Sequence, residues 1–254
     1  RSMKRVKLTV AYDGTNYCGW QVQPNGITVQ EVLNRHLSEL TGETIETIGA
    51  SRTDAGVHAL GNVAVFDTRV RMPGEKFSFA LNQRLPEDIR IQESREVPET
   101  FHPRYVESEK TYEYQILNRR FPIPTERFYS HFTYVPLDIE KMQEAGGYLL
   151  GEHDFKSFCG AGAQVKTTVR CIHALDITKE ADKITIRIRG NGFLYNMVRI
   201  IAGTLMEIGG GAYPPAHMRA ILEAKDRKAA GPTAPARGLT LVQIKYPDSA
   251  FNAP

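Results

Sequence analysis

Asp54 is the residue whose neighbours best suit it for chemistry. It lies in the run Gly49-Ala50-Ser51-Arg52-Thr53-Asp54-Ala55-Gly56-Val57-His58-Ala59, where Arg52 precedes the carboxylate by two positions. The small residues leave space for the backbone to approach a bulky substrate, and an arginine can hold a phosphate and keep a neighbouring acid ionised. An ordinary turn, with the aspartate bonded to its own backbone and Gly56 at positive φ, has the same spacing. The spacing alone therefore favours a structural turn over a catalytic loop.

The length of this run and further motifs along the chain indicate a known family. The other motifs, in chain order, are Tyr12-Asp13-Gly14-Thr15, Gly19-Trp20-Gln21, Phe101-His102-Pro103-Arg104-Tyr105, Lys110-Thr111-Tyr112-Glu113-Tyr114, Gly151-Glu152-His153-Asp154-Phe155, Asn196-Met197-Val198-Arg199, Ala224-Lys225-Asp226-Arg227 and Gly238-Leu239. Together they resemble the TruA family of transfer-RNA pseudouridine synthases, in which the matching aspartate is the essential residue. The resemblance covers nearly the whole chain. It departs from the family in small ways, such as Thr240 where many relatives carry an aromatic residue.

The resemblance implies a role for each candidate site residue. Asp54, Tyr112 and Arg199 would be catalytic: Arg199 would pair with Asp54, and Tyr112 would stack on the target base and help to remove its C5 proton. Arg52 would fill the place of a flipped nucleotide or hold its backbone, and Leu241 would close over the uracil. From the residues alone, a position in a strand core is the favoured interpretation of both Tyr112 and Leu241. Arg199 also fits an exposed surface, and Arg52 fits a contact with Asp54 inside the turn.

The implied reaction converts uridine to pseudouridine in the anticodon stem-loop of tRNA, at positions 38, 39 and 40. It breaks the bond from C1′ to the base nitrogen, turns the base and joins C1′ to C5. The reaction needs a carboxylate near the sugar, a hold on the uracil and a group that takes the C5 proton. An aspartate with its ordinary pKa of about 3.9 is ionised at neutral pH. We expect no cofactor, tRNA as substrate and, from the resemblance, a homodimer in which one tRNA contacts both subunits.

Two other classes of function fit parts of the sequence. A noncatalytic RNA-binding protein would also use tandem sheet domains and basic stripes, but it would not need Asp54, Tyr112 and Arg199 together. A carboxylate-dependent hydrolase needs a second acid, a metal cluster or a Ser-His-Asp arrangement, and the sequence offers no convincing one. The pseudouridine synthase reading is therefore favoured.

The composition is that of a globular protein without a membrane anchor. The chain has 254 residues, of which 41% are apolar and 24% charged. No stretch approaches the roughly 20 apolar residues that span a membrane. Arg1 and Ser2 before Met3 look like residues left from expression, and no signal-peptide pattern follows. We expect a cytoplasmic protein that does not bind membranes.

The cysteines and histidines indicate neither disulfides nor a metal. Cys18, Cys159 and Cys171 are odd in number and widely spaced, and no Cys-x-x-Cys or His-Glu-x-x-His motif occurs. We therefore predict reduced thiols and no metal site.

A basic stripe is the one charge pattern that suggests RNA contact, because the net charge is only +3. Residues 183–189 alternate three cations with three isoleucines: Lys183, Arg187 and Arg189 against Ile184, Ile186 and Ile188. Alternation places the cations on one face of a strand and the isoleucines on the other. The three cations are candidate RNA contacts, although a solvated outer face explains the pattern about as well.

The periodicity predicts an α+β chain of two ferredoxin-like domains, residues 1–105 and 106–254. The first domain is predicted to have strands at 6–12, 44–50, 62–68 and 89–97 and helices at 29–40 and 75–84. The second is predicted to have strands at 111–117, 168–178, 183–189 and 239–246 and helices at 139–150, 193–206 and 215–224. Thr28 and Glu31 form a capping box, and Asp138 is a further cap. The resemblance adds that this is the pseudouridine synthase fold, with the sheets meeting at a central RNA-binding cleft.

Overall fold

The computed structural model describes residues 2–252 and divides into two compact units. Unit 1 runs to Ser108 and takes in the chain from Leu241 onward, and unit 2 is Glu109–Thr240. Each unit combines a sheet with helices, as the α+β prediction requires. The units differ from the predicted ranges in two respects: the boundary follows Ser108 instead of residue 105, and the last strand groups mainly with unit 1 rather than with the second half of the chain.

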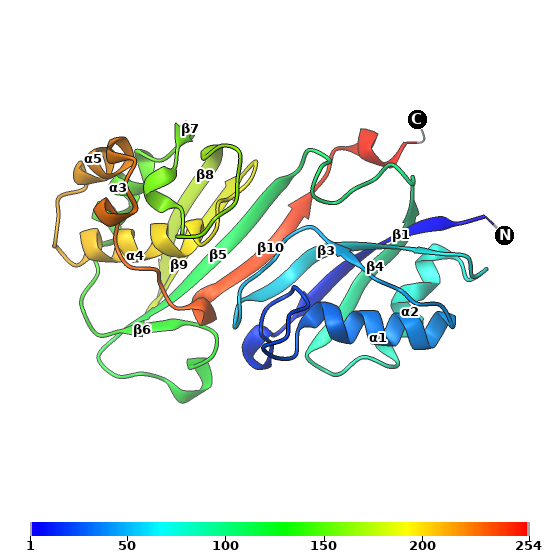
Figure 1. Ribbon diagram of the computed structural model, residues 1–254. Coiled ribbons are helices and arrows are strands. Elements are labelled where there is room, and N and C mark those ends of the chain that lie inside the picture. Colours follow the sequence, from blue (N-terminus) through cyan, green and yellow to red (C-terminus); the bar gives the residue numbers. More distant parts are fainter. Residues whose placement is uncertain (1, 253–254) are drawn as a thin grey trace. The chain divides into compact units, whose positions relative to one another are not determined.

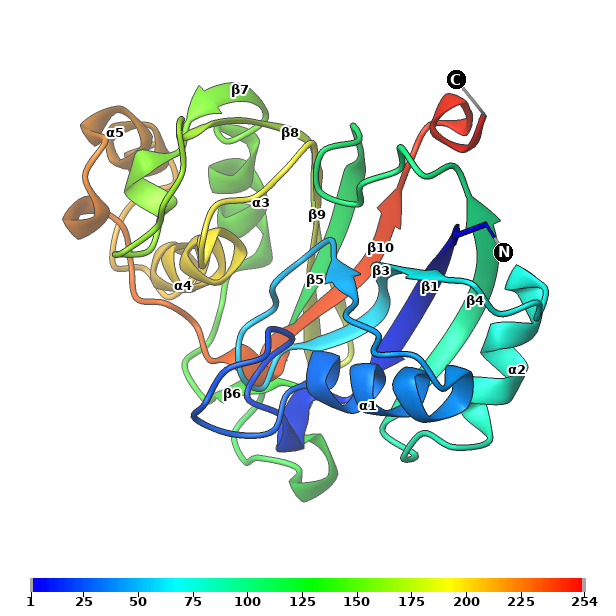
Figure 2. The same cartoon turned by 45° about the vertical axis from the view of Figure 1, so that its right-hand side comes forward.

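Unit 1 consists of an antiparallel sheet whose helices lie on one face (Figures 1 and 2). The strands follow the order β4-β1-β3-β10, with the short β2 paired to β3. In chain order the elements are β1 (Lys4–Tyr12), α1 (Val29–Thr41), β2 (Ile48–Gly49), β3 (His58–Thr68), α2 (Phe77–Asn82), β4 (Ile89–Val97) and β10 (Leu239–Lys245). This order makes β1 and β3 the central strands of the unit.

Alternating apolar residues on β1 and a helical stripe on α1 form the core of unit 1. Val6, Leu8 and Val10 are fully buried, as are Leu33 and Leu37 of α1. The periods of two and of three to four residues place each set on a single face. This core fixes β1 and β3, and β3 is the strand that follows the Asp54 loop.

The start of α1 confirms the predicted cap, whereas the predicted strand at 44–50 is largely wrong. Thr28 accepts a hydrogen bond from the backbone N–H of Glu31 at 3.2 Å. Only Ile48–Gly49 pairs as a strand. The preceding N–H groups bond instead to side chains of α1, since Ile45 donates to Ser38 Oγ and Thr47 donates to Asn34 Oδ1, each at 2.9 Å.

Aromatic contacts hold the C-terminal residues to unit 1. The Tyr246 hydroxyl donates to the carbonyl of Pro103 at 2.7 Å, and its ring meets Phe101 edge-on with centroids 4.9 Å apart. Phe251 stacks on Phe101 at 5.6 Å, and the Arg95 guanidinium lies 4.4 Å above the Phe251 ring. Burial of Phe101 and Tyr246 holds the chain after β10 to unit 1.

Unit 2 also places its helices on one face of an antiparallel sheet, in the order β5-β9-β8-β7 (Figure 1). The short β6 pairs in parallel with β5. In chain order the elements are β5 (Glu109–Asn118), β6 (His131–Thr133), α3 (Ile139–Gly147), β7 (Gly151–Asp154), β8 (Val169–Glu180), β9 (Lys183–Gly190), α4 (Met197–Gly209) and α5 (His217–Ala224). The three isoleucines of β9 are fully buried and its arginines are exposed, which confirms the predicted alternation.

Several predicted boundaries in both units need correction. The helix predicted at 193–206 begins only at Met197, because Asn196 has a φ of +60° and interrupts any helix through it. The helix predicted at 75–84 is a 3₁₀ turn at Gly74–Lys76 followed by α2. Asp138 caps α3 as predicted, by accepting from the Lys141 N–H at 3.1 Å. The strands β6 and β7 were not predicted, because three or four residues carry too little periodicity.

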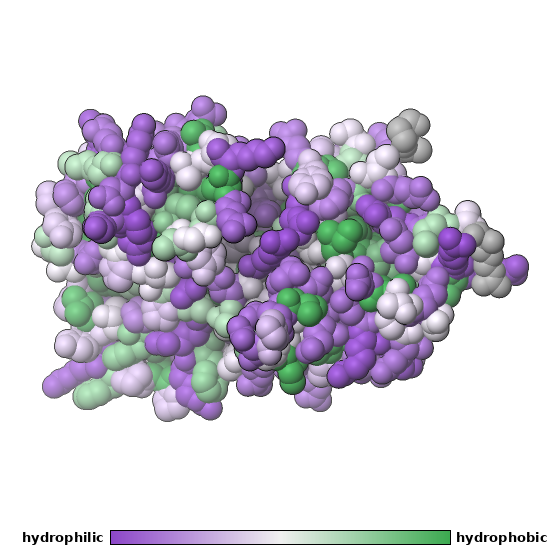
Figure 3. Space-filling view, in the orientation of Figure 1, coloured by the Kyte–Doolittle hydropathy of each residue, from purple (hydrophilic) through white to green (hydrophobic). Residues whose placement is uncertain are grey.

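The surface in Figure 3 is mostly hydrophilic, with apolar residues in small separate groups. Within residues 2–252, no helix has the length and apolar character that a membrane-spanning helix needs.

Candidate active site

Asp54 lies on the loop between β2 and β3, at the first position of a tight turn. The N–H of Val57 donates to the Asp54 carbonyl at 3.0 Å, and Gly56, the third residue of the turn, has a φ of +83°. A turn with a left-handed third residue requires glycine there. Asp54 is half-buried, whereas its neighbours Thr53 and Val57 are buried. The turn therefore presents the carboxylate at the edge of a fixed loop.

Three polar side chains secure the chain before Asp54. The Tyr12 hydroxyl is 2.6 Å from Thr53 Oγ1, and Asn62 Nδ2 donates to the Tyr12 hydroxyl at 3.1 Å and to the Ser51 carbonyl at 3.0 Å. Tyr12 and Asn62 come from β1 and β3, and both are at least 96% buried. Buried polar groups satisfied in this way hold a single geometry. The loop is thus anchored to the two central strands of unit 1.

The Gly19-Trp20 motif supports the same loop from the other side. The backbone N–H of Trp20 donates to the Thr53 carbonyl at 3.1 Å. Gly19 has a φ of +80°, and a Cβ there would lie 2.5 Å from the Thr53 carbonyl oxygen. Only glycine fits such a close approach. Gly19 therefore brings the backbone directly against the residue that precedes Asp54.

The Asp13-Gly14 motif fixes the far end of the turn. The Gly14 N–H donates to His58 Nδ1 at 2.9 Å. Asp13 Oδ1 lies 3.3 Å from the same nitrogen and also accepts from the Thr15 N–H at 3.0 Å. Both ends of the Asp54 turn are consequently held by motifs that lie more than thirty residues earlier in the chain.

Arg52 is exposed, between the buried Ser51 and Thr53. This alternation turns its side chain away from the core that its neighbours occupy. The structure thus places a cation two residues before Asp54 on the outer side of the loop.

Tyr112 lies on β5 of unit 2, in register with Ile188 of β9. It is 8% exposed, and its ring meets Phe193 edge-on with centroids 5.2 Å apart. Tyr114 and Ile116 on the same strand face are fully buried. The expectation that Tyr112 shares a core face is confirmed, and Tyr112 is the most exposed of the three.

Arg199 is the third residue of α4 and is half-buried. Its Nε donates to the Ala234 carbonyl at 2.8 Å, and its Nη1 lies 3.3 Å from Asn196 Oδ1. The alternative of a surface arginine is therefore wrong. A cation in the first turn opposes the helix dipole at a cost of about 0.3 to 1 kcal/mol, and no acidic residue of that turn compensates it. Stabilisation of α4 therefore does not explain why an arginine occupies this position.

Leu241 is fully buried on β10. The structure places it in the core of unit 1, and its predicted contact with uracil remains a prediction.

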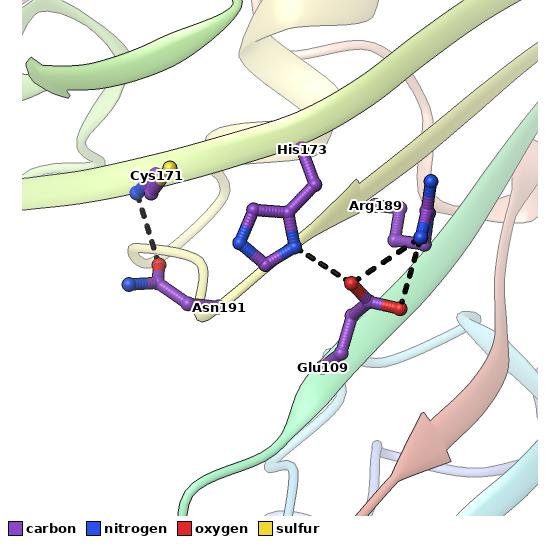
Figure 4. A network of polar contacts seen from close by, with 5 residues as sticks. All are labelled: Glu109, Cys171, His173, Arg189 and Asn191. Carbon is purple, nitrogen blue, oxygen red and sulfur yellow. Dashed lines mark hydrogen bonds and ion pairs between the residues drawn. The ribbon is translucent and has the colours of Figure 1, made fainter.

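The basic stripe is matched by carboxylates. Arg187 Nη1 lies 2.6 Å from a carboxylate oxygen of Glu113, and Lys183 Nζ lies 3.3 Å from one of Glu126. Figure 4 shows that the Glu109 carboxylate lies between His173 and Arg189, at 2.7 and 3.3 Å. Partial burial would raise the pKa of the Glu109 carboxyl, but hydrogen bonds from His173 and Arg189 outweigh it and lower that pKa. Each cation of the stripe thus already has an anionic partner.

Within the described residues 2–252, no group of three or more His, Cys, Asp and Glu side chains is arranged to hold a metal ion. The cysteines of this part of the chain are free thiols.

Comparison with known proteins identifies the class to which this fold and these motifs belong. A family model described as tRNA pseudouridine synthase matches residues 8–106 and 145–247, which include Asp54 and Arg199. A protein named tRNA pseudouridine synthase A from Thermoanaerobacter sp. (strain X514) is 49% identical over 244 residues, which cover 96% of this chain and 100% of the relative. The protein of the same name from Acetivibrio thermocellus is 50% identical with the same coverage. This chain belongs to the tRNA pseudouridine synthase family, whose enzymes are isomerases.

Proposed function

We propose that this enzyme forms pseudouridine in the anticodon stem-loop of tRNA, at positions 38, 39 and 40, with Asp54 as the reactive carboxylate. The observation that carries the proposal is the anchoring of the Asp54 loop. Tyr12, Asn62 and Gly19 fix the backbone on both sides of Thr53. A carboxylate held in one orientation is what a reaction at a bulky sugar needs, because a misplacement of about 1 Å can cost 100-fold in rate.

Asp54 acts at the sugar of the target uridine. In one route its carboxylate attacks C1′ and displaces the uracil; in the other it removes a proton from C2′ and the uracil leaves as a glycal forms. In both routes the uracil then turns and its C5 bonds to C1′; in the first route the Asp54 carboxylate leaves C1′, and in the second Asp54 returns the proton to C2′. C5 then loses its proton, and the base nitrogen freed from C1′ gains one. The atoms of the product are those of the substrate, so the overall reaction consumes no redox partner or cofactor.

Arg199 and Tyr112 complete the catalytic set. Arg199 keeps the reacting carboxylate ionised, a role that its unfavourable position in the first turn of α4 supports. Tyr112 stacks on the uracil and helps to remove the C5 proton, and its slight exposure at the edge of a core face supports this role. Leu241 closes over the base.

Arg52 assists the extrusion of the target nucleotide. A uridine in a structured RNA must leave its stack before an enzyme can reach its sugar, at a cost of a few kcal/mol. The exposure of Arg52 next to the fixed Thr53-Asp54 segment suits it to hold the displaced backbone.

The ion pairs of the stripe make RNA contact by Lys183, Arg187 and Arg189 less favourable than the sequence suggests, because a phosphate would have to displace a carboxylate. We expect Arg187→Ala to leave the dependence of tRNA affinity on salt unchanged and Arg52→Ala to flatten it. Each phosphate contact contributes a slope of about 0.7 to 0.9 in log affinity against log salt. Filter binding over a range of salt measures both slopes. A slope reduced by that amount in Arg187→Ala would restore the stripe as an RNA contact.

Two further proposals rest on the family alone. The enzyme acts as a homodimer in which one tRNA contacts both subunits, and it works in the cytoplasm, where tRNA is modified.

Position-resolved mapping of pseudouridine on unmodified tRNA tests the proposed specificity. We expect the purified protein to form pseudouridine in the anticodon stem-loop without an added cofactor, and to leave other uridines unchanged. A protein that binds tRNA tightly and converts no uridine would instead be the noncatalytic RNA-binding protein that the tandem sheets also allow. Product only outside the anticodon stem-loop would overturn the specificity and leave the reaction intact.

A further inference from the structure

The segment of residues 230–235 lies against α4 and contacts Arg199 through a reciprocal pair of bonds. The Ala234 N–H donates to the Arg199 carbonyl at 3.1 Å, and Arg199 Nε donates to the Ala234 carbonyl at 2.8 Å. A guanidinium is planar, so fixing Nε fixes the direction in which its remaining N–H groups point. The orientation of Arg199 therefore depends on the position of the Ala234 carbonyl, which is 35 residues away in the chain.

Arg227 anchors the segment before Ala234. Its Nη1 donates to the Gly231 carbonyl at 2.8 Å, and its Nη2 donates to Thr233 Oγ1 at 3.2 Å. Gly231 also donates to the buried Thr204 Oγ1 of α4 at 2.9 Å. The two bonds from Arg227 use both terminal nitrogens of its guanidinium, and the single amine of a lysine cannot make both.

Tyr114 anchors the segment after Ala234. Its hydroxyl donates to the Pro235 carbonyl at 2.7 Å. Burial raises the pKa of this hydroxyl, and the charges of Arg199 and Arg237 only partly oppose that shift, so the group stays protonated and can donate. Ala234 is thus held on both sides, by Arg227 before it and by Tyr114 after it.

The segment itself allows little adjustment. A Cβ on Gly203 of α4 would lie 1.8 Å from the Pro232 carbonyl oxygen, which shows how closely the two backbones approach. Pro232 and Pro235 fix φ at two of the six positions. A segment so confined transmits a displacement of either anchor to the Ala234 carbonyl.

We propose that Arg227 and Tyr114 are positioning residues that orient Arg199 for the reaction by holding the Ala234 carbonyl. The inference rests on the proposed catalytic role of Arg199. It assigns a role to Arg227 of the Ala224-Lys225-Asp226-Arg227 motif and to the hydroxyl of Tyr114, whose ring lies in the core.

Two conservative variants test this inference. Tyr114→Phe removes the hydroxyl, and Arg227→Lys keeps the charge but loses the pair of terminal nitrogens that bond to Gly231 and Thr233. We expect each to slow pseudouridine formation under single-turnover conditions by about 10- to 100-fold, because the guanidinium is misdirected. The dissociation constant of the tRNA complex should change less than about twofold, since the phosphate contacts that dominate affinity are untouched.

Tyr246→Phe is the matched control. Its hydroxyl also donates to a proline carbonyl at 2.7 Å, but in unit 1. We expect this variant to lose comparable thermal stability and to keep the parental rate. A rate loss equal to that of Tyr114→Phe would overturn the inference, because it would trace the effect to lost stability.

Combining each variant with Arg199→Lys separates positioning from general damage. A lysine has no Nε–H at that place for Ala234 to hold, so Tyr114→Phe and Arg227→Lys should each cost less than about twofold more in the slow Arg199→Lys background. The same factor in both backgrounds would refute positioning while leaving the role of Arg199 intact. If Arg199→Lys alone reacts at the parental rate, the proposed catalytic role of Arg199 fails, and the inference fails with it.

Discussion

Asp54→Asn is expected to lower the rate of pseudouridine formation by about 10⁴-fold or more, because it removes the charge that either route requires at the sugar. The side chain keeps its size, and the variant retains the contacts of Tyr12, Asn62 and Gly19 with the loop. The tRNA affinity should therefore stay within about threefold of the parent, since phosphate contacts supply most of it. Single-turnover conversion and filter binding on the same preparation measure the two quantities.

A matched loss of charge elsewhere in unit 1 provides the control. Glu46→Gln removes an exposed carboxylate before β2 and should leave both rate and affinity at parental values. An equal loss of rate in Glu46→Gln would show that the effect of Asp54→Asn comes from net charge. A parental rate in Asp54→Asn would remove Asp54 from the mechanism.

Tyr112→Phe is expected to keep tRNA binding and to slow the release of the C5 proton by about 10²- to 10⁴-fold, the usual contribution of a positioned acid or base. The phenylalanine ring still meets Phe193 and can still stack on the uracil. Release of tritium from tRNA labelled at uridine C5 measures this step, and quench-flow sampling shows whether an intermediate accumulates.

The ring and the hydroxyl of Tyr112 can be separated by a second variant. Tyr112→Leu should also weaken the hold on the base, by about 1 to 3 kcal/mol if the ring stacks on it. If Tyr112→Phe releases tritium as fast as the parent, the hydroxyl takes no part in catalysis. Tyr112 would then be a core residue packed on Phe193 and Ile188.

The sequence predicted the Asp54 loop but not what holds it. Two strand patterns with a turn signal between them were enough to place Asp54 on a loop, and the family motif drew attention to it. The roles of Tyr12 and Asn62 depend on the pairing register that sets Val10 opposite Asn62 and Tyr12 opposite Ala59. A single sequence does not specify such a register, so these two supporting residues could not be selected from their positions alone.

Arg199 shows a second limit of pattern analysis. The residues alone allowed an exposed surface position for Arg199, and they do not show what covers its face of α4. In the structure the 230–235 segment packs on α4, with the Pro232 carbonyl directly against Gly203. Gly203 was the one signal in the sequence that another segment packs on α4. Glycine destabilises a helix interior, so its presence there indicates that a second backbone comes close to the helix.

The basic stripe shows the same limit for charges. Alternation in 183–189 predicted the face on which the cations lie, and the structure agrees. The partners of Arg187 and Arg189 are Glu113 and Glu109 of β5, more than seventy residues earlier, so the neutralisation of these two arginines follows from strand order and not from local sequence.

The most direct test of the whole account is a time course of pseudouridine at every uridine of an unmodified tRNA, with the parent enzyme beside Asp54→Asn. The account predicts product confined to the anticodon stem-loop with the parent enzyme, and no product at any position with Asp54→Asn although it still binds the tRNA. Pseudouridine formed by Asp54→Asn at the parental rate would contradict the central claim that this carboxylate performs the reaction.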